Sequence, residues 1–269
     1  MMISNTFSTL LFATLTTMLC SCTSTPSIPS APSPALVKEF APSGSLRAAI
    51  NLGNPILANK DSAGQPYGVS VDLARELGKR LGVPVELVPF TAAGKVVEAV
   101  KAAQVDIAFV AIDPVRGGDM AQTPAYVQIE GAYMVPNASP IKTNAEVDRA
   151  GHRIVVGINS AYDLYLTREI KAATLVRAPS SPTVLDMMAA QKLEVAAGVK
   201  QQLQMDAKRI PGMRLLEGRF MVINQAMGLP KGRDAAHAYL SGFVQEMKAS
   251  GFVAQALATH KIEGAAVAP

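Results

Sequence analysis

Residues 105–112 (Val-Asp-Ile-Ala-Phe-Val-Ala-Ile) form a run that is apolar at nearly every position. A strand of this composition is typical of a parallel sheet whose two faces are both covered by helices. Two strand–helix units precede it, with strands predicted at 46–51 and 83–89 and helices at 70–81 and 94–104. Strand, helix, strand, helix, strand in this order predicts a parallel sheet with right-handed crossovers.

The same alternation restarts in the second half of the chain. Ser160 follows a predicted strand and can cap a helix, and the pair Ser181-Pro182 is typical of a helix start. The pattern predicts strands at 153–158, 174–177, 193–198, 213–216 and 220–229, and helices at 160–171, from 181, at 233–249 and from 252 toward His260. Two βα sets of similar size follow one another, so we expect two lobes.

Composition excludes several functions. The chain has 269 residues and a net charge of +4 with no basic run, so it lacks the stripe of a nucleic-acid binder. Cys20 and Cys22 are its only cysteines, which rules out a disulfide framework in the body. The histidines at 152, 237 and 260 are far apart in sequence, and we expect surface or capping roles for them. No metal site and no cofactor are indicated.

The first 22 residues predict an export signal. Residues 7–19 are uncharged and mostly apolar, too short for a membrane-spanning helix of about 20 residues but right for a signal peptide. Leu19-Cys20-Ser21-Cys22 resembles the bacterial lipobox, which would make Cys22 the lipidated residue. A plain cleaved signal is the alternative. Residues 23–43 are rich in Pro and Ser and predict an unstructured tether, with order beginning near Ser45.

Five short motifs stand in a familiar order along the body. They lie at 68–73 (GVSVDL), 105–108 (VDIA), 113–116 (DPVR), 123–126 (TPAY) and 228–232 (GLPKG). Through them, residues 44–265 resemble the bacterial extracellular solute-binding proteins of the amino-acid ABC transporter class. The resemblance implies an α/β, two-lobed periplasmic-binding-protein type 2 fold, in which two hinge strands join two parallel-rich lobes. Lobe 1 would comprise 44–131 plus 224–269, and lobe 2 would comprise 132–223.

The same resemblance implies a function. Such proteins capture a small solute in the cleft by hinge closure and deliver it to an ABC permease in the inner membrane. We therefore expect a monomeric substrate-binding protein, periplasmic or extracellular and anchored through its lipid. A dehydratase of the cyclohexadienyl or arogenate type on the same fold is one alternative, with Glu130 as candidate acid. A sensory lipoprotein is the other.

Arg116 is the main candidate for ligand binding. The resemblance implies that it clamps a ligand carboxylate, which its planar guanidinium matches with two parallel hydrogen bonds. The alternative is a solvated arginine paired with Asp113 or Asp119. Ser160, Ala161 and Tyr162 begin a predicted helix, whose amino end favours anions; Tyr162 could equally pack in the core. Ile112, Asp113 and Asn54 are also expected to contact the ligand.

Three positions depart from the family pattern. Asp113 stands in place of a threonine, Val199 in place of the aspartate that accepts the ligand's amino group, and Leu57 near the place of a stacking aromatic. The expected ligand is therefore a small carboxylate, either an amino acid or a related organic acid.

Overall fold

The computed structural model describes Met1, Met2 and residues 31–269. The lipobox, Cys22 and nearly all of the expected signal segment lie outside the described residues. Among the helices that are described, none is long and apolar enough to cross a membrane.

One mixed sheet of ten strands runs through the body, in the order β4-β1-β5-β11-β6-β9-β7-β8, with β10 and β12 also paired to β6. The strands are β1 (Leu46–Asn51), β4 (Val85–Phe90), β5 (Ile107–Ala111), β6 (Met120–Pro136), β7 (Arg153–Gly157), β8 (Thr174–Ala178), β9 (Val195–Val199), β10 (Met213–Leu215), β11 (Met221–Pro230) and β12 (Ala266–Val267). The run at 105–112 forms β5, and all five of its residues from Ile107 are buried.

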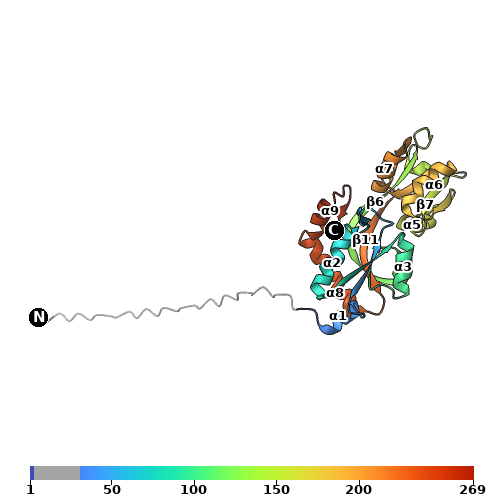
Figure 1. Cartoon of the computed structure of the whole chain (residues 1–269). Coiled ribbons are helices and arrows are strands. Elements are labelled where there is room, and N and C mark those ends of the chain that lie inside the picture. The colour runs from blue at the N-terminus through green and yellow to red at the C-terminus, as the bar shows by residue number, and fades with distance from the viewer. Residues whose placement is uncertain (3–30) are drawn as a thin grey trace. The chain divides into compact units, whose positions relative to one another are not determined.

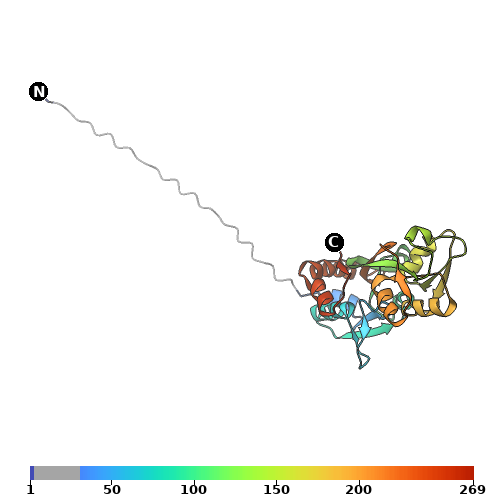
Figure 2. The same cartoon turned by 90° about the horizontal axis from the view of Figure 1, so that it is seen from above.

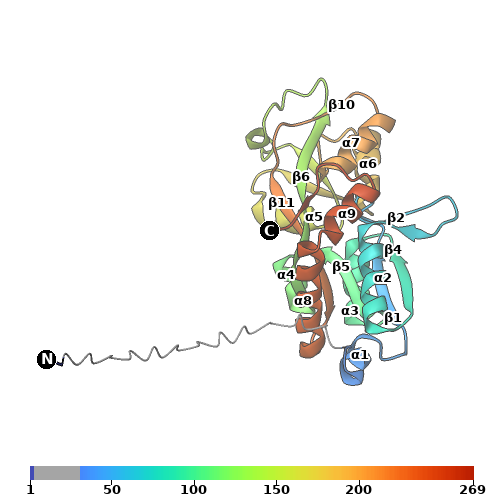
Figure 3. The ribbon, with the colours of Figure 1, turned by 90° about the vertical axis from the view of Figure 1, so that its left-hand side faces the viewer.

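Two parallel sets of strands form the two lobes. In lobe 1, β1 pairs in parallel with β4 and β5, and in lobe 2, β7 pairs in parallel with β8 and β9. The long strands β6 and β11 pair antiparallel with each other and run from one lobe into the other (Figure 1; Figure 3). The two-lobed α/β prediction is confirmed. Its boundaries at 131/132 and 223/224 fall inside β6 and β11, which continue without a break, so those boundaries stay a prediction.

Helices cover both faces of the sheet. They are α1 (Pro34–Phe40), α2 (Val69–Leu81), α3 (Ala93–Lys101), α4 (Pro114–Asp119), α5 (Ala161–Glu169), α6 (Val184–Gln191), α7 (Lys200–Arg209), α8 (Asp234–Ala249) and α9 (Phe252–Thr259), with 3-10 turns η1 (Asn144–Glu146) and η2 (Ser181–Thr183). The predicted leucine stripe of α2 is buried, at positions 73, 77 and 81. A short hairpin of β2 (Asn59–Lys60) and β3 (Pro66–Tyr67) projects from lobe 1 (Figure 2; Figure 3).

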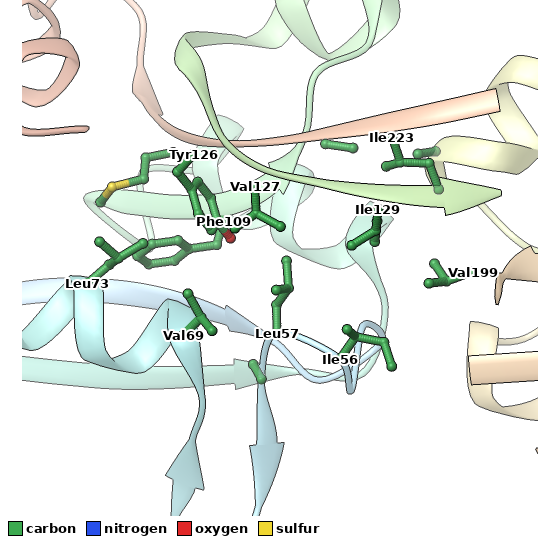
Figure 4. Close-up of a cluster of buried hydrophobic side chains, with 14 of the residues drawn as sticks. Ile56, Leu57, Val69, Leu73, Phe109, Tyr126, Val127, Ile129, Val199 and Ile223 are labelled. Atoms are coloured by element: carbon green, nitrogen blue, oxygen red, sulfur yellow. The ribbon is translucent and has the colours of Figure 1, made fainter. Parts of the chain in front are cut away.

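One apolar core passes from lobe 1 into lobe 2. Ile56 and Leu57 follow β1, and they belong to the same buried cluster as Ile129, Ile223 and Val199 (Figure 4). Ile129 lies on β6 and Ile223 on β11, so the strands that connect the lobes also carry the core between them.

Two helices do not start where the sequence predicted. α2 begins at Val69, one residue before the predicted Ser70, and the Ser70 side chain contacts the Tyr126 hydroxyl. Ser181 lies inside a 3-10 turn that Ser180 caps, and α6 starts only at Val184. Ser160 does cap α5, as predicted, by accepting from the Asp163 N–H. The sequence therefore placed the starts of these three helices within three residues but identified the capping residue only for α5.

Ordered structure begins earlier than predicted. Residues 34–40 of the expected tether form α1, capped by Ser33 with Pro34 in its first turn. Phe40 is 1% exposed and meets Tyr239 of α8 edge to face, with ring centroids 5.8 Å apart. Arg233 also donates to the Glu39 carbonyl. The prediction was wrong here because one buried aromatic residue anchors the segment without giving it any periodicity.

We expect Phe40→Ala to lower the free energy of unfolding by about 3 kcal/mol, since it removes a fully buried aromatic ring. Urea denaturation followed by circular dichroism measures this loss. Lys38→Ala, on an exposed position of the same helix, is the matched control and should leave the midpoint unchanged. An unchanged midpoint for Phe40→Ala would show that α1 adds nothing to the body.

Candidate functional site

A small cavity lies where the carboxyl ends of several strands meet. Its volume is about 30 Å³, and it is lined by Asn51, Gly53, Asn54, Ala93, Ala111, Arg116, Ser160, Ala161, Tyr162, Ser181, Val199, Ile223 and Gln225. Asn51 ends β1, Ala111 ends β5 and Val199 ends β9. In open α/β sheets, ligands bind outside the carboxyl ends of the strands, so the fold puts this cavity where a site is expected.

Arg116 is the cavity's only charged residue, and its side chain is 2% exposed. Its Nη1 donates to the Ala111 carbonyl at 3.0 Å and its Nη2 to the Asn159 carbonyl at 2.8 Å. A guanidinium carries five N–H donors, so three remain beyond these two bonds. Burial lowers the pKa of Arg116 to about 10, a change that nearby Asp113 partly offsets.

The alternative partners expected for Arg116 are occupied elsewhere. Asp113 caps α4 by accepting from the Val115 N–H, and its other carboxylate oxygen accepts from Arg168 at 2.9 Å. Asp119 pairs with Lys101 at 3.0 Å. Within the part of the chain that the structure describes, no carboxylate lies within ion-pair distance of Arg116. A buried cation without a counter-ion is costly unless another anion supplies one.

Three contacts near Arg116 hold lobe 1 against lobe 2. Arg116 and Asp113 belong to α4 of lobe 1, whereas their partners Asn159 and Arg168 lie in lobe 2. Asn159 also lies so close to Gly94 of α3 that a Cβ on Gly94 would stand 2.7 Å from the Asn159 Cβ. Only glycine permits this approach. The lobes are therefore in direct contact around the cavity.

The other predicted residues divide into two groups. Asn54, Ser160, Ala161 and Tyr162 line the cavity with Arg116, whereas Ile112 is 46% exposed outside it and Asp113 faces Arg168. The Tyr162 ring packs in the core. Burial raises the pKa of Tyr162, and hydrogen bonds with Ser181, Ser160 and the Gly157 backbone partly offset this rise. The buried Asn54 Oδ1 has no hydrogen-bond partner among the described residues, which indicates a missing donor at the cavity.

Sequence reasoning missed three polar residues of the cavity: Asn51, Ser181 and Gln225. Ser181 was taken only as a helix cap. Gln225 stands in the otherwise apolar stretch 225–229, a signal that could have revealed it. The pairing of β11 with β6 shifts register beside Gln225, and such irregularities commonly re-aim a side chain next to a site.

Val199 and Leu57, two of the positions that depart from the family pattern, lie in different surroundings. Val199 lines the cavity and is 8% exposed, whereas Leu57 is buried in the core beside it. Glu130 lies on β6 outside the cavity. Hydrogen bonds from Arg219 and Lys200 lower the pKa of Glu130, the opposite of what a general acid needs.

A wider groove of about 470 Å³ runs along α7, between Lys200, Gln204, Lys208 and residues 261–264. Lys200 pairs with Glu130 at 3.0 Å, and Gln204 and Lys208 are exposed. This groove is solvated and has no buried charge without a counter-ion, so it is the weaker candidate despite its size.

The three histidines are partly buried rather than on the surface. His152 and His237 hydrogen-bond to the carbonyls of Val147 and Gln122, and His260, at the end of α9, contacts Asp72. The described residues contain no group of three or more side chains that could hold a metal ion.

Comparison with known proteins gives the family. The model of the bacterial extracellular solute-binding proteins, family 3, matches residues 46–261. The chain belongs to this family. A search of curated protein sequences found no significant match.

Solved structures share the fold of this solute-binding protein at low identity. A solute receptor for L-cysteine from Neisseria gonorrhoeae has a TM-score of 0.73 at 22% identity, over 83% of this chain and 92% of that one. A putative ABC-transporter binding component from Wolinella succinogenes, complexed with lysine, has a TM-score of 0.70 at 20% identity, over 81% of this chain and 95% of that one. A histidine kinase sensor domain has a TM-score of 0.73 at 18% identity, over 83% of this chain and 98% of that one. Most relatives are binding proteins, although sensors and enzymes also use the fold.

We expect Arg168→Ala to open the cleft of this solute-binding protein. The change leaves the Asp113 carboxylate, which is 5% exposed, without its partner in lobe 2, at a cost of about 1–3 kcal/mol to the closed arrangement. Small-angle X-ray scattering should show a larger radius of gyration.

Arg177→Ala is the matched control for Arg168→Ala. Arg177 is 41% exposed against 40% for Arg168, and it pairs with a similarly buried aspartate, Asp163, but within lobe 2. This variant should destabilise lobe 2 without changing the radius of gyration. If both variants scatter like the parent, the pair between Asp113 and Arg168 does not control closure.

Proposed function

We propose that this chain is the substrate-binding component of an ABC-type importer and captures a small carboxylate-bearing solute by hinge closure. The observation that carries the proposal is the buried guanidinium of Arg116, which lines the cavity between the lobes and has no carboxylate partner among the described residues. A ligand carboxylate would supply the missing charge and match the fork of the guanidinium.

Arg116 also links ligand binding to closure of the two lobes. Arg116 already joins lobe 1 to lobe 2 through the Asn159 carbonyl. A ligand held by Arg116 and by Ser160 or Tyr162 would touch both lobes at once, and the closed state would gain contacts that the open state lacks. Family membership supports this reading, and the permease would then recognise the closed form.

Export and anchoring complete the proposal. Cys22 would carry a lipid, residues 23–33 would act as a tether, and the body from α1 onward would stand off the membrane surface as a monomer in the periplasm or outside the cell. The family's extracellular character supports export, and the lipobox supports the anchor.

The ligand should be found by native mass spectrometry of freshly purified protein, followed by thermal-shift screening of amino and organic acids. A ligand that binds only the folded state raises the melting temperature. Prephenate belongs in the screen, because steady turnover of prephenate would replace the transport proposal with a dehydratase. Stoichiometric binding without turnover is the expected result.

We expect Arg116→Met to weaken carboxylate binding by about 10- to 150-fold, the equivalent of losing a charged hydrogen bond of about 1.5–3 kcal/mol. Stability of the free protein should change by no more than about 1 kcal/mol, because the methionine removes an uncompensated buried charge while keeping the volume. Isothermal titration calorimetry and urea denaturation measure the two quantities.

Arg80→Ala serves as control for Arg116→Met, because Arg80 pairs with Glu246 far from the cavity and should not affect affinity. A large loss of stability with unchanged affinity in Arg116→Met would make Arg116 a structural residue.

For the anchor, we expect the full-length chain, expressed in a bacterium, to incorporate labelled palmitate. Cys22→Ser should abolish the label because it removes the sulfur that carries the lipid, whereas Cys20→Ser should retain it. Label in Cys22→Ser would contradict the assignment.

A further inference from the structure

We infer that the cavity selects small hydroxy acids and rejects α-amino acids: its ligand carries a carboxylate for Arg116 and a neutral hydroxyl, and no ammonium group. The inference rests on the proposed function, since it names the substrate class of the same site.

No side chain of the cavity wall can neutralise an ammonium group. The lining residues include no aspartate and no glutamate, and their only charge is that of Arg116. An ammonium buried beside this guanidinium would lose its hydration and face a like charge.

The acidic residues within three positions of a lining residue already have cationic partners. Asp113 accepts from Arg168 at 2.9 Å, Asp163 pairs with Arg177 at 3.0 Å and Asp119 pairs with Lys101 at 3.0 Å. Glu130, farther along the chain on β6, is held between Lys200 and Arg219. None of these carboxylates is free to turn toward a ligand without breaking its own ion pair.

Three helices that begin beside the cavity, one in lobe 1 and two in lobe 2, add positive potential to it. Their first turns begin at Ala93, Ala161 and Lys200, in helices of 9, 9 and 10 residues. The residues before α3 and α7 are Ala92 and Val199, which make no side-chain cap. The amino ends of helices attract anions and repel cations, so the helices and Arg116 act in the same direction.

Val199 makes the wall apolar where β9 meets α7. It is 8% exposed and belongs to the same buried cluster as Ile56, Ile129 and Ile223 (Figure 4). A ligand's second carbon would meet methyl groups here, which favours CH over a charged nitrogen.

The buried cavity oxygen that lacks a partner among the described residues is neutral. Asn54 Oδ1 is an acceptor and requires a donor. A ligand hydroxyl can donate to it without bringing a charge. The cavity's volume of about 30 Å³ holds about two water molecules as it stands, so the ligand must be short.

Isosteric pairs test the selection directly. Calorimetric titration at pH 7 should show glycolate binding at least 10-fold more tightly than glycine, and L-lactate at least 10-fold more tightly than L-alanine. Each pair differs only in a hydroxyl against an ammonium. Equal or tighter binding of the amino acids overturns the inference and leaves the proposed function standing.

Val199→Asp should reverse the preference, because it places a carboxylate in the cavity wall. L-alanine is expected to gain at least 10-fold and L-lactate to lose as much, whereas the neutral matched control Val199→Asn should gain no affinity for L-alanine. A Val199→Asp protein that folds, as judged by circular dichroism, and still prefers L-lactate counts against the inference. If this variant does not fold, the two wild-type pairs decide.

If the proposed function is wrong, the binding measurements give a different set of results. If none of the four probes binds, the inference is wrong. A larger carboxylate whose binding depends on Arg116 would then still support the proposed function, whereas no carboxylate binding at all would overturn both.

Discussion

The guanidinium of Arg116 is buried between two lobes, and its hydrogen-bond partners are main-chain carbonyls, one from each lobe. Among the described residues, this positive charge has no counter-ion, and its side chain is buried from water. Around it, the pair of Asp113 with Arg168 and the close approach of Gly94 to Asn159 depend on the lobes being together. The charge of the cavity wall and the proposed role in closure both depend on where this one side chain lies.

The sheet explains why the charge can be held there. β6 and β11 pass through both lobes and carry the apolar core from one lobe to the other. The strand ends bring Asn51, Ala111 and Val199 to one edge, and three helices begin at that edge. Helix amino ends and a buried arginine together favour an anion at this position, which supports the proposed site beyond what family membership specifies.

Local signals predicted much of this body, and their failures have physical causes. β1 has the predicted bounds, Leu46–Asn51, because the apolar residues at 46, 48, 49 and 50 are all buried in the sheet. α7 was not predicted, since its sequence KQQLQMDAKR buries only Gln202, Leu203 and Asp206 and shows no apolar stripe. α1 was assigned to the tether because its contacts with α8, through Phe40 and Glu39, leave no pattern in the sequence.

By itself, the sequence determined the two βα sets, the family, and most of the residues around the cavity, because periodicity and short motifs are local properties of the chain. It also named Arg116 and the loss of an acidic residue at Val199. Only the tertiary structure decided that Arg116 lacks a counter-ion, that Asp113 belongs to Arg168, and that Gln225 and Ser181 join the wall. Those facts depend on distances between segments tens of residues apart, and charge pairing in a buried site is set by such distances alone.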